Sequence, residues 1–287
     1  MKQGKHSVTI GILAAILAAL LFAAMDIFVK ALGRIGTGEI TFLRGLIGLL
    51  FLPFLARRAA ETVFSGKDRL LLHVRGFTGG FGILLFFFSL RGLTLGDAEI
   101  LAQLCAFFMC VLSPFFLKNN PKGNILLPLL IIAGGAGLVL QVWNFHSFNE
   151  YALLGLASAF FSACAYICIG KLTEVPGRHS GIEIVFYFQF YSMLCGAVLV
   201  PFDFVMPEGL EWLWIFGLSV TAISAQMAFT WGCQHVHSLI ISFVMYTGIL
   251  FHILGGWIFW GEVLTIWSWA GGALIVGGSA LLLWRTR

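Results

Sequence analysis

Long apolar runs dominate this sequence and restrict what it can fold into. A helix that crosses the hydrocarbon core of a bilayer needs about 20 apolar residues. Runs of that length, separated by short polar connections, cover residues 9–32, 39–57, 69–91, 95–117, 123–142, 150–172, 182–202, 210–232, 237–260 and 265–284. The sequence therefore predicts an all-α integral membrane protein with ten transmembrane helices.

The composition agrees with a membrane protein and gives no sign of a soluble domain. Of the 287 residues, 60% are hydrophobic and 10% are charged, whereas a soluble domain carries about 25% charged residues. The net charge is +4, but the basic residues lie between apolar runs, so the expected partner is the lipid bilayer and not nucleic acid. The first run is too long for a signal-peptide core, and we expect it to be a true span.

The second half of the sequence repeats the first. Residues 95–141 and 238–284 each hold two apolar runs joined by a short polar turn, and adding 143 to Gly134 gives Gly277. Five spans separate the matching segments, so a span and its copy cross the membrane in opposite directions. Inverted repeats of this kind are typical of secondary transporters. We predict two five-helix repeats, residues 1–145 and 146–287.

Lysine and arginine residues indicate how the chain is oriented. With ten spans, both termini lie on the same side of the membrane. That side collects most basic residues of the connections, among them Arg57, Lys67 and Lys118, whereas the other side has Arg34 and Arg91. Because cytoplasmic connections are enriched in Lys and Arg, we expect both termini in the cytoplasm.

Two short motifs carry a resemblance to a known family. Thr-Phe-Leu-Arg-Gly ends at Gly45 in the second run, and Gly261-Glu262 forms the turn before a glycine-rich last run. With its two five-span repeats, the chain resembles the drug/metabolite transporter superfamily, and its EamA family in particular, over almost its whole length. The first repeat departs from the pattern, because Lys118-Asn119 replaces Gly-Glu. The resemblance implies a small carrier of organic metabolites in the bacterial inner membrane, with its site in a central cavity.

Polar residues at membrane depth are costly and tend to face a cavity or a partner. In the ninth run, Ser242, Tyr246 and His252 fall on one helix face, and the offset maps Glu99 onto Ser242 and Gln103 onto Tyr246. The two faces are predicted to line a substrate cavity. Glu99 either binds a substrate amine or carries a coupling proton. The alternative is that it lies near the start of its helix and is partly exposed to water. His252 either titrates near neutral pH or bonds to a neighbouring helix.

Charged residues in the first three runs leave alternatives open. Asp26 and Lys30 are four residues apart on one helix face, and they form either an internal ion pair or contacts to a zwitterionic substrate. Arg44 pairs either with Glu39 or with a substrate carboxylate. Arg75 is expected either to extend to the cytoplasmic membrane surface, as long basic side chains do, or to anchor the third run.

The remaining candidates are Gln226, Trp231 and Tyr166. Trp231 either stacks on a substrate ring or anchors its helix at the membrane interface. Glu262 is expected to shape the turn and not to bind substrate. The glycines of the fifth and tenth runs are expected to let helices pack closely, and any that are exposed would form the contact of a homodimer.

The favoured function is a secondary transporter that moves a small polar organic metabolite, an amino acid or a related compound, by alternating access. The family resemblance favours export, and proton coupling through Glu99 or Asp26 is a hypothesis. The alternative is an importer of a cofactor-like solute. No Walker motif is present, so ATP is not expected to drive transport directly.

Other classes fit the sequence less well. The six cysteines lie inside apolar runs without a Cys-x-x-Cys pair, so neither a disulfide framework nor a metal site is predicted. His235-x-His237 stands alone and no acidic motif of a membrane transferase occurs, so we expect no enzyme activity and no cofactor. A channel would need charged rings or a backbone filter, which the sequence does not display.

Overall fold

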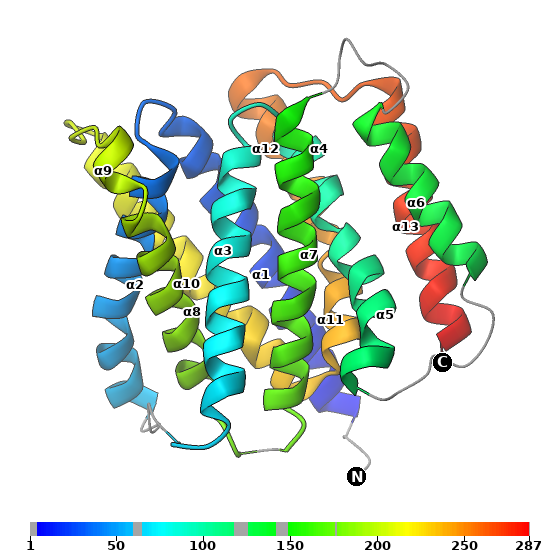
Figure 1. Ribbon diagram of the computed structural model, residues 1–287, viewed down its shortest axis with the longest axis horizontal. Helices are drawn as coiled ribbons and strands as arrows, with labels where there is room; N and C mark the ends of the chain where they lie inside the picture. The colour runs from blue at the N-terminus through cyan, green and yellow to red at the C-terminus, as the bar shows by residue number, and fades with distance from the viewer. Residues whose placement is uncertain (1–4, 60–64, 118–125, 142–148, 176, 287) are drawn as a thin grey trace.

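Helices running side by side in one bundle make up the structure (Figure 1). The computed structural model describes residues 5–59, 65–117, 126–141, 149–175 and 177–286, and these residues include no strand. The helices are α1 (Lys5–Ala31), α2 (Thr37–Ala59), α3 (Arg69–Ser89), α4 (Leu95–Ala102), α5 (Leu104–Leu117), α6 (Leu126–Leu140), α7 (Glu150–Leu172), α8 (Gly181–Ala197), α9 (Val200–Asp203), α10 (Glu211–His235), α11 (Ser238–Val244), α12 (Thr247–Trp260) and α13 (Ile266–Thr286).

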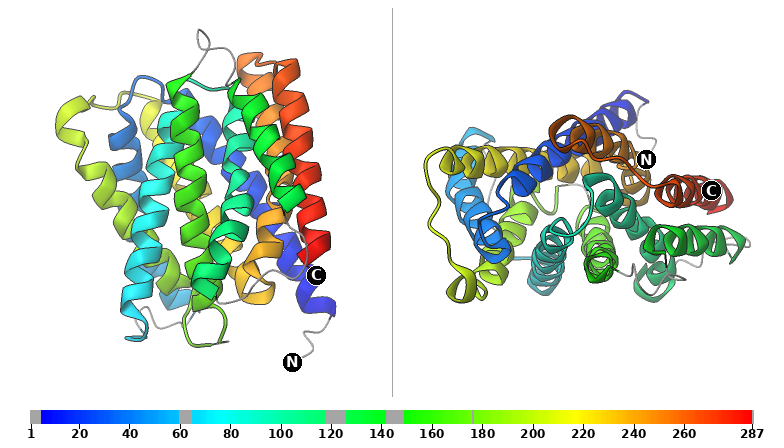
Figure 2. Two further views of the ribbon diagram at one scale, coloured as in Figure 1. Left: turned by 45° about the vertical axis from the view of Figure 1, so that its right-hand side comes forward. Right: turned by 90° about the horizontal axis from the view of Figure 1, so that it is seen from above.

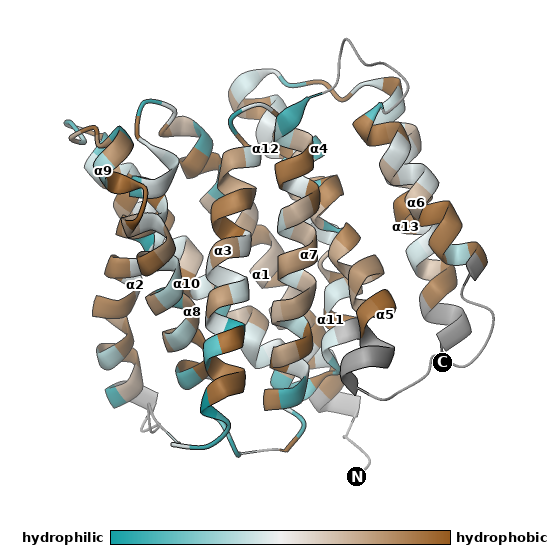
Figure 3. Cartoon of the chain, in the orientation of Figure 1, coloured by the Kyte–Doolittle hydropathy of each residue, from teal (hydrophilic) through white to brown (hydrophobic). Residues whose placement is uncertain are grey.

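The described helices are those of a multi-pass membrane protein. Seven helical segments are long and apolar enough to cross a bilayer, and the apolar helices Leu127–Leu140, Gly181–Ala197 and Ile266–Leu282 are shorter. Apolar residues follow the helices along their length, while hydrophilic residues gather in the turns that join α2 to α3 and α7 to α8 (Figure 3). The all-α membrane class predicted from the sequence is therefore confirmed. The predicted repeat boundary near residue 145 lies outside the described residues, as does the Lys118-Asn119 turn.

Two of the predicted spans are interrupted. The run 95–117 is divided at Gln103 into α4 and α5, and the run 237–260 is divided at Met245 and Tyr246 into α11 and α12. At each interruption the backbone tightens, since Ala106 N donates to Gln103 O and Gly248 N donates to Met245 O, both three residues back. Most of each run is still a helical segment long enough to cross a bilayer, but the sequence does not predict the interruptions, which lie 143 residues apart.

The seventh run also ends earlier as a helix than the prediction states. The run 182–202 ends as a regular helix at Ala197, and the separate short helix α9 covers Val200–Asp203. Pro201 at the start of α9 has no backbone N–H to donate, and it follows the last turn of α8. The chain then turns back to begin α10 at Glu211.

Helices distant in sequence pack in pairs. The main contacts join α1 with α10, α3 with α7, α2 with α8 and α6 with α13. The pair α2–α8 lies at one edge of the bundle and α6–α13 at the other, as the view from above shows (Figure 2). Gly135 and Gly271 bring α6 and α13 together, because a Cβ on Gly135 would lie 2.7 Å from the carbonyl oxygen of Gly271. Close packing through these two glycines is confirmed, and the homodimer stays a prediction.

The Gly261-Glu262 turn connects three parts of the bundle. Gly261 ends α12 with a φ of 64°, a left-handed conformation that glycine adopts without a steric penalty. The Glu262 carboxylate then accepts hydrogen bonds from Leu95 N, at 2.8 Å, and from Lys30 Nζ. Glu262 therefore joins the α12–α13 turn to α1 and to the start of α4, in agreement with its predicted role in the turn.

Candidate functional site

A cavity lies in the middle of the bundle, between helices from both halves of the chain. It contains about 880 Å³ of space not filled by protein atoms, including open solvent. Six of the predicted site residues line it: Asp26, Glu99, Gln103, Tyr166, Gln226 and Ser242. They come from α1, α4, the interruption after α4, α7, α10 and α11, so the fold brings together residues more than two hundred positions apart.

One wall of this cavity carries a carboxylate–histidine cluster, which consists of Asp26, Glu99 and His252. The Nε2 atom of His252 lies 2.8 Å from an Asp26 carboxylate oxygen and 3.9 Å from a Glu99 carboxylate oxygen. The Nδ1 atom of His252 lies 2.8 Å from the carbonyl oxygen of Gly248. All three side chains are buried, and His252 lies behind the two carboxylates and not in the cavity lining.

The hydrogen bonds of His252 determine how many protons the cluster holds. A carbonyl oxygen only accepts, so Nδ1 must carry the hydrogen that it donates to Gly248. A hydrogen bond between Nε2 and Asp26 then requires a second hydrogen, either on the ring or on the carboxyl group. A neutral imidazole beside two ionised carboxylates would not provide this second hydrogen. The cluster therefore holds one additional proton.

The two helix interruptions contact each other beside the cluster. The Gln103 side-chain amide donates to a carboxylate oxygen of Glu99 and, at 3.3 Å, to the backbone oxygen of Met245. The Tyr246 hydroxyl donates to the backbone oxygen of Gln103 at 3.1 Å and lies 2.6 Å from Ser279 Oγ. Side chains from each interruption thus satisfy backbone oxygens of the other. Tyr246 itself lies outside the cavity lining.

Two buried arginines, Arg44 and Arg75, lie at a different part of the site and are called the arginine pair below. The guanidinium carbons of Arg44 and Arg75 lie 5.0 and 4.7 Å from the ring centre of Phe188. Arg75 and Phe188 line the cavity, and Arg44 lies behind the ring. Arg44 Nη1 donates to Ser192 Oγ at 3.3 Å.

The predicted alternatives for these arginines need correction. Arg75 is 2% exposed, so the prediction that it extends to the membrane surface is wrong. Glu39 accepts a hydrogen bond from Val205 N at 3.0 Å and forms no ion pair with Arg44 among the described residues. The physical reason is that Glu39 lies at the start of α2, where the chain segment after α9 covers it.

The predicted Asp26–Lys30 ion pair does not form. Lys30 bonds to Glu262 and donates to the Leu93 backbone oxygen at 2.9 Å, whereas Asp26 bonds to His252. Lys30 lies near the end of α1, where its long side chain extends to the α12–α13 turn. Lys30 does not line the cavity, and the predicted contact with a substrate stays a prediction.

Trp231 also lies away from the cavity. It is 40% exposed, and its ring centre lies 4.1 Å from that of His235 on the same helix. The predicted stacking of Trp231 on a substrate ring therefore has no support in the geometry. The alternative, that Trp231 anchors its helix at the membrane interface, is compatible with this exposure and stays a prediction.

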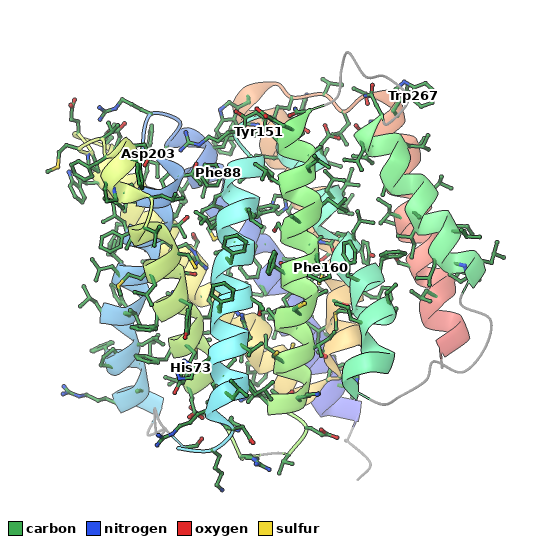
Figure 4. The ribbon with its side chains drawn as sticks, in the orientation of Figure 1. His73, Phe88, Tyr151, Phe160, Asp203 and Trp267 are labelled. Atoms are coloured by element: carbon green, nitrogen blue, oxygen red, sulfur yellow. The ribbon has the colours of Figure 1, made fainter. Side chains whose placement is uncertain are left out.

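The two ends of the bundle each carry an ion pair between a turn and the start of a helix. At the end that holds α9 and Asp203, Arg34 pairs with Glu211; at the end toward which His73 lies, Arg178 pairs with Asp68 at 2.7 Å (Figure 4). Arg34 and Arg178 are 144 residues apart, and Asp68 and Glu211 are 143 apart. The two pairs, called end latches below, thus occupy equivalent positions of the two halves.

The second end latch extends into a small polar network. His179 Nε2 lies 3.0 Å from Asp68, and His179 Nδ1 lies 2.8 Å from Glu183. The hydrogen bond to His179 and the charge of Arg178 hold the pKa of Asp68 below its usual value. Asp68 is therefore ionised, and the latch intact, at neutral pH.

Comparisons with known proteins place the chain in a family. The model of the EamA-like transporter family matches residues 9–141 and again residues 150–284. The pseudopaline exporter CntI of Pseudomonas aeruginosa strain UCBPP-PA14 is 34% identical over 279 residues, which cover 96% of each chain. The chain belongs to the EamA-like transporter family.

This EamA-like transporter is also similar to more distant proteins. Solute carrier family 35 member G1 of Mus musculus is 24% identical over 284 residues, which cover 93% of this chain and 76% of that one. A solved crystal structure covers 96% of this chain and 97% of its own, with a TM-score of 0.69 at 19% identity. That structure shows that the fold is shared.

Arg75 is absent from the site residues that the sequence predicts for this EamA-like transporter. Its position six residues inside α3 suggests a side chain that reaches the surface. A useful signal is the group of small residues that follows it, Gly76, Gly79 and Gly80, which marks a face where another helix approaches closely. That helix is α8, which carries Phe188. Within the described residues, no three His, Cys, Asp or Glu side chains are grouped as metal ligands.

Proposed function

We propose that this chain exports a small polar organic solute, an amino acid or a related compound, by proton-coupled alternating access. The observation that carries the proposal is the carboxylate–histidine cluster at the wall of the central cavity. Its two carboxylates can attract a solute amine, and its extra proton lies between His252 and Asp26. The similarity to a protein named as an exporter supports this direction of transport.

Alternating access needs two halves that can move against each other. We propose ten spans in two inverted repeats, residues 1–145 and 146–287. The interruptions at Gln103 and Tyr246 support this arrangement, since they occur at equivalent positions and contact each other. The packing supports it too. In the repeat, α1 corresponds to α7 and α10 corresponds to α3, and both α1–α10 and α7–α3 are main contacts of the bundle. Transporters of this kind bind their substrates near the interruptions of such helices.

The proposed orientation places both termini in the cytoplasm of a bacterial cell, with the chain in the inner membrane. The ribbon shows both termini at the same end of the bundle (Figure 1). Turns at that end carry Lys67 and Arg178, which agrees with the enrichment of basic residues on the cytoplasmic side.

Proton exchange follows from competition for the same negative charge. A solute ammonium group near Glu99 and a further proton on the cluster, beyond the one held between His252 and Asp26, both neutralise it, so binding of one weakens binding of the other. If protons enter from outside while solute leaves from inside, the inward proton gradient drives export. The end latches then separate and reform alternately as the cavity opens to each side.

A metabolite comparison tests the export function. Cells with and without the protein are compared for solutes that accumulate outside in a protein-dependent manner, and the pH gradient is then collapsed with an ionophore. We expect accumulation that falls when the gradient is removed. Accumulation inside the cells would favour the importer of a cofactor-like solute instead. Export that ignores the pH gradient would rule out the proton coupling.

A further inference from the structure

The arginine pair presents an unusual charge problem. Arg44 and Arg75 are 0% and 2% exposed, and an arginine side chain stays protonated in proteins. Burying a charge is costly unless an opposite charge and hydrogen bonds compensate for it. Ionisable groups at membrane depth therefore pair with each other or mark the path of a substrate.

Neither arginine has a carboxylate in direct contact among the described residues, and the charge of Asp26 acts on Arg44 only from a longer distance. Among the described residues, no carboxylate oxygen lies within 4.0 Å of either guanidinium group, and Arg44 Nε, Arg44 Nη2 and Arg75 Nε are buried without a hydrogen-bond partner. The contact with the Phe188 ring is a weaker interaction than the cost of removing an ion from water.

The carboxylates of the same cavity are already engaged. Asp26 bonds to His252, and Glu99 accepts from Gln103 and lies 3.9 Å from His252. With its additional proton, the carboxylate–histidine cluster has a net charge of −1, while the arginine pair carries +2. The site as a whole is therefore positive and would be neutralised by a solute with one net negative charge.

Arg75 lines the cavity, and its guanidinium group lies against Gly79 of the same helix. Gly79, one helical turn after Arg75, has no side chain, and a Cβ there would collide with Arg75 Nη1. The Gln226 amide nitrogen, on the opposite helix α10, is buried without a hydrogen-bond partner and lines the same cavity. Guanidinium and amide N–H groups are donors suited to a carboxylate, and arginine can hold one with two parallel hydrogen bonds.

We propose that Arg75, supported by the charge of Arg44 behind Phe188, binds a carboxylate group of the exported solute. The solute is then an amine that carries at least two carboxylates, with its ammonium group directed to Glu99 and its carboxylates to Arg75. This inference rests on the proposed export function and narrows its substrate class from polar metabolites in general to amino-dicarboxylic compounds.

Counting functional groups on the exported solutes tests the proposal even before any of them is identified. Protein-dependent extracellular solutes are treated to esterify their carboxylates and, separately, to acetylate their amines, and mass shifts give the number of each. We expect at least two carboxylates and more carboxylates than amines. Exported solutes with one carboxylate or none would overturn this inference and leave the export function standing. A complete absence of protein-dependent solutes would overturn both.

Variants of Arg75 provide the second arm. Arg75→Gln should lower the export of these solutes by about tenfold or more, since a hydrogen bond to a charged group is lost. Arg75→Lys keeps the charge but lacks the planar guanidinium group, so its export should lie between that of Arg75→Gln and that of the wild type. Arg69→Gln, on the exposed start of the same helix, should export normally. Amounts of folded protein are checked by gel filtration; if Arg75→Gln does not fold, wild-type export by Arg75→Lys would overturn the proposal.

Discussion

The two charged parts of the cavity, the carboxylate–histidine cluster and the arginine pair, differ in how their charge is compensated. In the cluster, His252 lies within 4 Å of both Asp26 and Glu99, so protein groups compensate each other. In the pair, Arg44 and Arg75 contact an aromatic ring and have no carboxylate partner among the described residues. A compensated cluster can store a proton, whereas an uncompensated pair is suited to receive the charge of a ligand.

The largest expected effect comes from neutralising the cluster. Glu99→Gln and Asp26→Asn should each lower export about a hundredfold, because the solute amine and the coupling proton lose the same charge-assisted contacts. The residual export should no longer respond to the pH gradient. Extracellular accumulation in cells, with and without an ionophore, measures both effects.

Glu174→Gln is the matched control for this prediction, since Glu174 is an exposed carboxylate after the end of α7. It should leave export and its response to the gradient unchanged. Full export by both cluster variants would show that the cluster stores no coupling proton. The proposed division of roles between the cluster and the arginine pair would then be wrong.

The next effect separates function from stability. Arg75→Met should lower export about tenfold and yet raise the free energy of unfolding in detergent by about 1 kcal/mol or more, because an uncompensated buried charge is replaced by an apolar side chain. Thermal unfolding of the purified protein without solute measures the second quantity. A loss of stability would mean that Arg75 mainly holds α3 against α8 through Phe188.

A smaller effect on export is expected from a change where the two interruptions contact each other. Tyr246→Phe removes the hydroxyl that lies 3.1 Å from Gln103 O and 2.6 Å from Ser279 Oγ. Leaving buried groups unsatisfied should cost about 1–3 kcal/mol of stability. The pH response of export should persist, since the cluster is intact. Equilibrium unfolding gives the first quantity, and a vanished pH response would show that the interruptions and the cluster act as one unit.

The smallest effect concerns the exposed end latch formed by Arg178 and Asp68. The pKa of Asp68 is held below 3.8 by His179 and Arg178, so its contribution to stability is present above that pH and is lost as the pH falls through the lowered pKa. Asp68→Asn should therefore unfold slightly more easily at neutral pH and match the wild type in strong acid. Thermal unfolding across this pH range measures the difference. A constant difference at every pH would exclude the ion pair as its cause.

The sequence by itself determined the helices and most of their ends, because an apolar run of about 20 residues has local consequences that neighbours do not change. It also placed Glu99, Gln103 and Ser242 in one cavity through the offset of the two halves. It did not reveal the interruptions at Gln103 and Tyr246, because neither of these two positions holds a proline or a glycine.

The tertiary structure alone decided which charges meet. Asp26 and Lys30 are neighbours on one helix, and local geometry favours a pair, yet each bonds to a partner more than two hundred residues away, at His252 and Glu262. Arg75 is buried because α8 covers it with Phe188. The physical reason is that long side chains respond to the helix packed against them, and that helix is chosen by the fold of the whole chain.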